Sequence, residues 1–152
     1  MPSSRHLVFF NYTLATAAAV ALIGTSVTGC GSDNKSSGSQ VQQGQQAVVQ
    51  FSCTSCHGAN LAGTTVAMSM AYPANITPDP DTGIGSWETA TIVNAILNGI
   101  DDQGEQLCVM PKFGQAPYSM AQDQATAIAA YLKSIPAVSQ MIPESNCGTG
   151  AQ

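Results

Sequence analysis

Apolar residues recur at helical spacing in three stretches of the chain, and these stretches predict its main helices. The first runs from 41 to 51, the second from 86 to 98 and the third from 119 to 133. Within each stretch, apolar side chains lie three or four positions apart, which places them on one side of a helix while polar residues face water. The pattern therefore predicts three helices joined by loops.

Local signals mark the ends of these helices. Ser86 is suited to cap the start of the second helix, and Gly99 is suited to stop it. Ser119 and Gln122 form the Ser-x-x-Gln pattern of a capping box at the start of the third helix. Pro136 bars the extension of that helix, because proline lacks an N–H and clashes with the preceding turn.

Glycine and proline residues predict turns and irregular loops in the remaining segments. Gly44 predicts either a close approach of another helix or a weak helix start, and Gly58 suits a helix C-terminus, where positive φ is needed. Between 60 and 85, three prolines and three glycines interrupt any periodic pattern. A loop of this length inside a compact domain is usually functional or disordered, so we expect it to serve a site.

The N-terminus has the form of an export signal. Arg5 precedes an apolar run over 7–23, and the small residues 27–29 come just before Cys30. The sequence Val-Thr-Gly-Cys over 27–30 resembles the lipobox of bacterial lipoproteins, which implies cleavage after residue 29 and acylation of Cys30. A retained membrane helix and plain secretion are the alternatives. The expected location is the periplasm or the outer face of a bacterial membrane, with a lipid anchor.

Composition divides the rest of the chain into a tether and a domain. Residues 31–40 contain no apolar side chain and are rich in glycine and serine, which is typical of a flexible linker. We therefore predict a signal peptide over 1–29, a tether over 30–43 and one domain over 44–152.

The charge balance restricts the partners of this domain. Four Lys and Arg against nine Asp and Glu give a net charge of −5. Removal of Arg5 with the signal leaves three lysines, so the mature charge is 3 − 9 = −6. An anionic surface disfavours nucleic acid as a partner and favours redox proteins that carry a basic docking patch.

The residues Cys53-Thr-Ser-Cys56-His57 are the strongest chemical signal in the chain. Two thiols three positions apart, followed at once by an imidazole, form the attachment signature of a c-type haem. One helical turn presents both sulfurs to the vinyl groups of a porphyrin, and the histidine supplies an axial nitrogen to the iron. A redox dithiol or half of a zinc site is the alternative, but the chain has no second Cys-x-x-Cys.

The tract from Asn75 to Trp87, NITPDPDTGIGSW, identifies a family that this chain resembles. It is similar to the "NITPD…TGIG.W" stretch of class I cytochrome c domains, especially the cytochrome subunits of periplasmic alcohol and sugar-acid dehydrogenases. The resemblance runs from about Gly44 to Pro136. It implies an all-α cytochrome c fold, with three to five helices and long loops around one covalently bound haem c. Those subunits commonly carry several haems, whereas this chain has one motif.

The second axial ligand is expected to be a methionine. His6 lies in the export signal, so the mature chain keeps His57 as its one histidine. The candidates are Met68, Met70, Met110, Met120 and Met141. The resemblance implies Met110, because the family's distal methionine is followed by proline at this place after the "TGIG.W" helix. Trp87 is expected to lie near the haem edge or donate to a propionate, or else to be an ordinary core residue.

Two cysteines remain after Cys30, Cys53 and Cys56 are assigned. In an oxidising compartment, Cys108 and Cys147 are expected to pair, which would tie the tail to the Met110 loop. The chain-entropy contribution of such a loop is about 3–4 kcal/mol. Two buried, unpaired thiols are the alternative.

These signals together predict a one-electron carrier rather than an enzyme. Axial ligands from His57 and Met110 would leave no open coordination position on the iron. The alternatives are a peroxidase-like haem enzyme and a haem module that senses small ligands, both of which need an open iron site.

Overall fold

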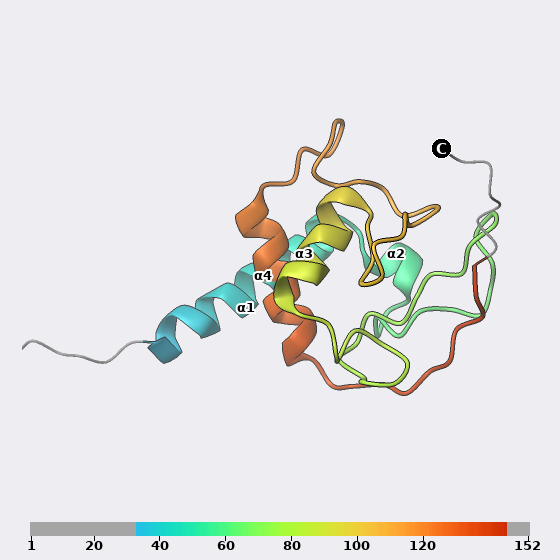
Figure 1. The fold of residues 1–152 in the computed structure, drawn as a ribbon. Helices are drawn as coiled ribbons and strands as arrows, with labels where there is room; N and C mark the ends of the chain where they lie inside the picture. Colours follow the sequence, from blue (N-terminus) through green and yellow to red (C-terminus); the bar gives the residue numbers. More distant parts are fainter. Residues whose placement is uncertain (1–32, 146–152) are drawn as a thin grey trace, which may run out of the picture. The chain divides into compact units, whose positions relative to one another are not determined.

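The computed structural model describes residues 33–145, and the structural statements below concern this range. It contains four helices, α1 (Asp33–Gln50), α2 (Thr54–His57), α3 (Thr89–Asn98) and α4 (Gln122–Ser134). Within the described range there is no strand, and β pairing is limited to two isolated bridges. The predicted all-α fold with long loops is confirmed (Figure 1).

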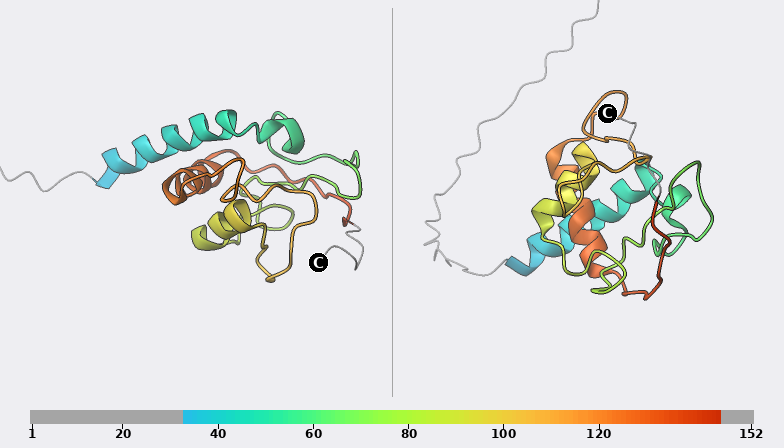
Figure 2. Two further views of the ribbon diagram at one scale, coloured as in Figure 1. Left: turned by 90° about the horizontal axis from the view of Figure 1, so that it is seen from above. Right: turned by 45° about the vertical axis from the view of Figure 1, so that its right-hand side comes forward.

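Helix α4 is the centre of the helical core. It packs against α1 on one side and α3 on the other, as Figure 2 shows. Its inward side chains, among them Ala125, Ile128 and Leu132, are almost completely buried. A Cβ at Gly44 would collide with the Ala127 carbonyl, so the predicted close approach of another helix at this glycine is confirmed.

Three predicted helix ends are confirmed. Gly99 caps α3 in the left-handed conformation, with φ of 69°, and its N–H donates to the Ala95 carbonyl. Gly58 follows α2 with φ of 79°. Helix α4 ends at Ser134, two residues before Pro136, as the missing N–H of proline requires.

Both predicted helix starts were wrong. Glu88, not Ser86, is the N-cap residue of α3, because the N–H of Trp87 donates to Ile84 and keeps residues 84–87 in a turn. At α4, Ser119 has φ of 48° and lies in a turn before the helix. The side chain of Gln124 reaches back to the N–H of Ala121 instead, at 3.0 Å. When two residues near a helix start could both serve as the N-cap, the sequence does not show which one is used. The position of the preceding turn decides it.

Helix α1 begins at Asp33, inside the segment 30–43 that was predicted to be a flexible tether. Once the packed part of a helix has formed, each further residue adds a backbone hydrogen bond, so a polar segment can extend it. The predicted signal peptide and Cys30 lie outside the described residues. Among the helices that the structure describes, none combines the length and apolar character of a membrane span.

After α4, the chain turns back along the loop between α2 and α3 (Figure 1). Residues 136–145, here called the tail strap, run beside this loop and exchange hydrogen bonds with residues 63, 72, 75, 77 and 82. Asn75, Thr77 and Asp79 are the buried polar residues of the loop. The loop that the sequence marks as irregular is thus held by polar contacts from the end of the domain.

Candidate cofactor site

The Cys-x-x-Cys-His motif forms a single turn at the start of α2. Cys53 caps this helix, and its carbonyl accepts the N–H groups of Cys56 and His57 at 3.3 and 3.0 Å. Both thiols are free. The turn begins where α1 stops, because Ser52 adopts a φ of 55° and changes the direction of the chain. The local backbone therefore presents two sulfurs and an imidazole together.

One nitrogen of the His57 ring is engaged by the backbone. Nδ1 lies 2.7 Å from the carbonyl oxygen of Ala74, a group that only accepts hydrogen bonds, so Nδ1 carries the proton. The neutral ring then has its lone pair on Nε2, the nitrogen that is available to a metal. Burial lowers the pKa of His57, and the bond to Ala74 opposes part of this shift.

The two thiols differ in exposure. Cys53 is half-buried and Cys56 is exposed. Burial raises the pKa of Cys53, and the neighbouring Cys56 adds to the rise. Redox-active dithiols need a thiol whose pKa is lowered, since the thiolate is the nucleophile. The raised pKa of Cys53 thus disfavours a role for this thiol as a redox nucleophile.

Met110 lies on a separate segment that is anchored at both ends to α3. We call residues 107–114 the methionine segment. Its first N–H, from Leu107, donates to Gly99 at 2.7 Å, and its last, from Gly114, donates to Leu97 at 3.0 Å. Met110 is half-buried and packs against the hydrophobic core. Both attachments are backbone bonds, so the position of Met110 depends on the C-terminal end of α3.

The five candidate methionines have different environments. Met68, Met70 and Met141 are 41%, 60% and 77% exposed, whereas Met120 is 5% exposed within the core. An axial ligand must be shielded from water on one side and accessible to the cofactor on the other. Among these five, Met110 alone combines partial burial with packing against the core.

Sequence reasoning missed two contacts that connect the site. The rings of Phe51 and Phe113 meet edge to face with centroids 5.8 Å apart, which links the chain before Cys53 to the methionine segment. The second is the Ala74 carbonyl, which has no sequence signal because every residue carries one. Trp87 is half-buried and packs against the core, which agrees with the interpretation of Trp87 as a core residue. Its predicted contact with a haem propionate stays a prediction.

The remaining predicted cysteines are described only in part. Cys108 is disulfide-bonded. Its predicted partner, Cys147, lies outside the described residues, as does Cys30, the predicted acylation site. The pairing of Cys108 with Cys147 therefore stays a prediction.

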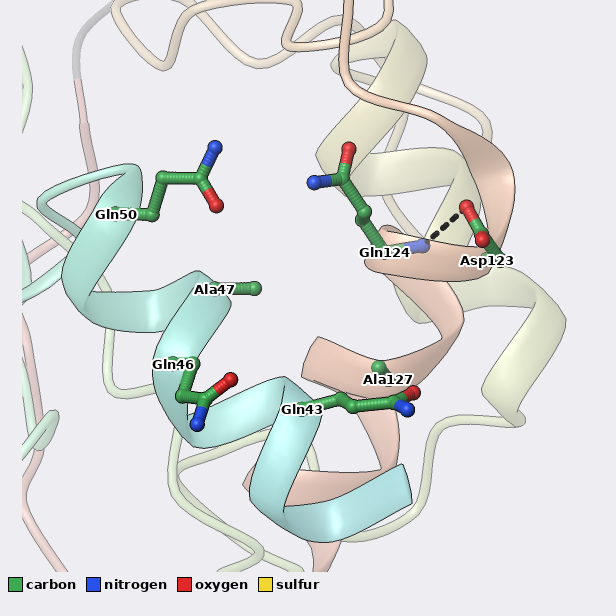
Figure 3. Close-up of a pocket in the computed structure, with 7 residues that line it drawn as sticks. All are labelled: Gln43, Gln46, Ala47, Gln50, Asp123, Gln124 and Ala127. Carbon is green, nitrogen blue, oxygen red and sulfur yellow. Dashed lines mark hydrogen bonds between the residues drawn. The ribbon is translucent and has the colours of Figure 1, made fainter. Parts of the chain in front are cut away.

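A pocket of about 290 Å³ lies between α1 and α4 (Figure 3). Carboxamide and carboxylate groups line much of it, including Gln43, Gln50 and Asp123. It contains none of the predicted site residues. Without a thiol, an imidazole or a thioether, this pocket lacks the donors that a haem requires.

The chemistry of the donor set tests whether the residues present fit a haem. Two free thiols lie within one helical turn. In the histidine beside them, Nδ1 is hydrogen-bonded to Ala74 and Nε2 is available to a metal. Thioether attachment needs reduced thiols, and axial ligation needs an unprotonated ring nitrogen. The residues meet both conditions and therefore fit a covalently attached haem.

Comparison with known proteins agrees with this fit. The sequence model of the family described as Cytochrome c matches residues 41–136, which is well over half of the chain. A relative from Pseudomonas putida, one of the subunits of nicotinate dehydrogenase, is 33% identical over 115 residues. The match covers 70% of this chain but 10% of the relative, so the chain spans about a tenth of that protein's length.

Proposed function

The chain belongs to the cytochrome c family, and we propose that it carries single electrons between redox proteins, with His57 and Met110 as the axial ligands of one haem c. Family membership implies both covalently bound haem c and electron transfer. The observation that carries the proposed ligation is the turn Cys53–His57, in which Ala74 holds Nδ1 and leaves Nε2 for the iron.

When bound, haem c supplies an iron that alternates between the ferric and ferrous states, and this is the chemistry of a one-electron carrier. Cys53 and Cys56 would hold the group through two thioether bonds, each formed by addition of an S–H across a vinyl double bond. His57 and Met110 would supply the two protein ligands of the iron. No axial position is then left for a substrate, which is why the proposal is a carrier and not a haem enzyme.

The ligation is tested by Met110→Ala, with Met141→Ala as the matched control because Met141 is 77% exposed. Methionine raises the reduction potential of haem relative to an open or water-filled position. The wild type and the control should show the weak methionine–iron band at the red end of the visible spectrum. The Met110 variant should lose this band and have a markedly lower potential. A wild type that binds carbon monoxide as readily as an open iron site would contradict the proposal and favour the sensing or peroxidase-like alternative.

We also propose that Cys30 is acylated and anchors the domain outside the cytoplasmic membrane. The support is the lipobox-like sequence over 27–30 after a basic and apolar segment. Stable anchoring requires more than one acyl chain. Mass spectrometry of the wild type should find a lipid on Cys30, and Cys30→Ala should abolish this lipid attachment. An unmodified Cys30 in membrane-bound protein would contradict this part of the proposal.

A dehydrogenase is the proposed electron donor. The similarity to a dehydrogenase subunit supports this class of partner, and the net charge of −5 supports a basic docking patch on it. In addition, we propose that the disulfide of Cys108 is made with Cys147, which would connect the tail to the methionine segment two residues before Met110.

A further inference from the structure

The tail strap, residues 136–145, makes contacts that converge on the surroundings of His57. We infer that the strap positions the His57 ring, and that Gln140 is the positioning residue. The inference rests on the proposed role of His57 as an axial ligand. The family match ends at residue 136, so nearly all of the strap lies beyond the part of the chain that the family model covers.

The first connection runs from the strap to the acceptor of the His57 ring. The N–H of Gln140 donates to Thr82 Oγ1 at 3.0 Å, and the same oxygen accepts Asn75 Nδ2 at 3.0 Å. Asn75 Nδ2 also donates to the carbonyl of Val138 in the strap at 2.7 Å. Asn75 directly follows Ala74, the residue whose carbonyl holds His57 Nδ1. The strap therefore holds the residue next to the acceptor by two routes.

The side-chain amide of Asn75 is hydrogen-bonded at both its nitrogen and its oxygen. Its Nδ2 donates to Thr82 and Val138, and its Oδ1 accepts the N–H and the hydroxyl of Thr77. The side chain is 3% exposed. A buried polar group that loses one of its partners keeps the cost of its desolvation, so such a network tolerates few alternative arrangements. The strap thus helps to hold the backbone at 74–75 in place through the bond from Asn75 to Val138.

The second connection reaches the backbone of His57. The side-chain Nε2 of Gln140 donates to the Gly63 carbonyl at 3.3 Å, and the Gly63 N–H donates to the His57 carbonyl at 2.9 Å. A Cβ at Gly63 would lie 2.5 Å from the carbonyl oxygen of Pro73, so this glycine is pressed against the segment that contains Ala74. Gln140 is therefore connected to the backbone of His57 through Gly63, and to the residue beside the Ala74 acceptor through Thr82 and Asn75.

The far end of the strap is held beside the same segment. The N–H of Tyr72 donates to Ser145 Oγ at 2.9 Å. The strap is thus attached both near its middle and at its last described residue. Since the attachments bracket residues 72–75, displacement of the strap would release the segment that carries the Ala74 carbonyl.

The electronic consequence has a definite sign. A hydrogen bond from Nδ1–H makes the imidazole a stronger electron donor, which favours the ferric state. If the strap loosens, the bond to Ala74 weakens and the ring donates less. The reduction potential should then become more positive, and the Nδ1 proton should exchange faster with solvent.

The test compares Gln140→Pro with Met141→Pro in the full-length holoprotein. The first change removes both hydrogen bonds of Gln140. The second makes the same backbone change one residue later, where the side chain is 77% exposed and no N–H bond is formed within the described residues. NMR of the 15N-labelled protein gives the exchange rate of the His57 Nδ1 proton, and redox titration gives the potential.

In Gln140→Pro we expect exchange about tenfold faster than in Met141→Pro, together with a more positive potential. Gln140→Ala keeps the N–H and loses only the contact with Gly63, so its exchange rate should lie between the two. It is the deciding variant if Gln140→Pro does not fold. Equal exchange rates and equal potentials in proteins with unchanged haem spectra would overturn the inference. A wild type without a six-coordinate spectrum would instead contradict the proposed ligation itself.

Discussion

The histidine and the methionine of the candidate site are held in physically different ways. His57 lies in a polar network, here called the histidine network. Its Nδ1 bonds to the Ala74 carbonyl, and its own carbonyl accepts the Gly63 N–H. The buried side chains of Asn75 and Thr77 belong to the same network and bond to the tail strap. The methionine segment is attached to α3 by backbone bonds at its ends, and Met110 between them has apolar contacts. Its neighbour Val109 is 45% exposed.

The chemistry of the two side chains explains the difference. An imidazole has a second nitrogen, so a hydrogen bond on Nδ1 can orient the ring while Nε2 remains available. A thioether is only a weak acceptor and offers no second polar atom by which it could be held. Packing, the anchoring of the flanking backbone and the disulfide of Cys108 are what remain to position Met110. The histidine side should therefore be the more rigid of the two.

A substitution at Gly63 should have the largest effect among the tests that compare the histidine side with the methionine side. Gly63→Ala places a methyl group 2.5 Å from the Pro73 carbonyl and should lower the free energy of unfolding by about 3 kcal/mol. Gly104→Ala is the control, because Gly104 has a similar positive φ, 85° against 80°, but no atom within 4 Å. It should cost about 1 kcal/mol, the backbone contribution alone. Denaturant unfolding of both variants measures the difference, and equal losses would show that the histidine side is not tightly packed.

Amide exchange in the native protein should show the next largest difference. The N–H groups of Leu107 and Gly114 anchor the methionine segment, whereas those of Ile76 and Ile84 lie in the histidine network. We expect the first pair to exchange at least about tenfold faster, because the methionine segment lacks a buried polar network like that of Asn75 and Thr77, and less restrained segments open at lower free energy. The bond of Leu107, at 2.7 Å, is shorter than those of the two isoleucines at 2.9 Å, and that of Gly114, at 3.0 Å, is longer, so bond length alone predicts no consistent difference between the pairs. The same protection in both pairs would remove the proposed asymmetry.

The smallest expected effect concerns acid stability. The hydroxyl and N–H of Thr82 donate to Asp79 and hold its pKa below the usual value. A lowered folded-state pKa contributes stability above the unfolded-state pKa, and this contribution is lost as the pH falls through the folded-state value. Thr82→Val should raise the pKa of Asp79. Because it also removes the oxygen that accepts from Gln140 and Asn75, its effect is judged on this pKa and on the pH at which acid unfolding begins, which should rise, and not on overall stability.

Thr82→Ser, which keeps the hydroxyl, is the control for this change. It should retain the acid unfolding profile of the wild type, as followed by circular dichroism. NMR titration gives the pKa of Asp79 directly. An unchanged pKa in Thr82→Val would show that the N–H bonds from Thr82 and Asp81 are sufficient without the hydroxyl.

Much of this architecture could be predicted because its determinants are local. The turn Cys53–His57 needs only residue types at fixed spacing, and the stops at Gly99 and Pro136 follow from the backbone chemistry of glycine and proline. The helix starts at Ser86 and Ser119 were predicted wrongly, since several residues near each start are suitable caps. Which one is used depends on turns made with more distant residues.

The sequence by itself determined that the chain is an all-α member of the cytochrome c family with one Cys-x-x-Cys-His turn. The reason is that a covalent attachment motif consists of consecutive residues. Tertiary structure alone decided which carbonyl meets His57 and which segment restrains that carbonyl. Ala74 and Gln140 carry no distinctive signal, since backbone acceptors and amide side chains are present throughout the chain. Their contacts join residues 17 and 77 positions apart, and only the folded chain brings such pairs together.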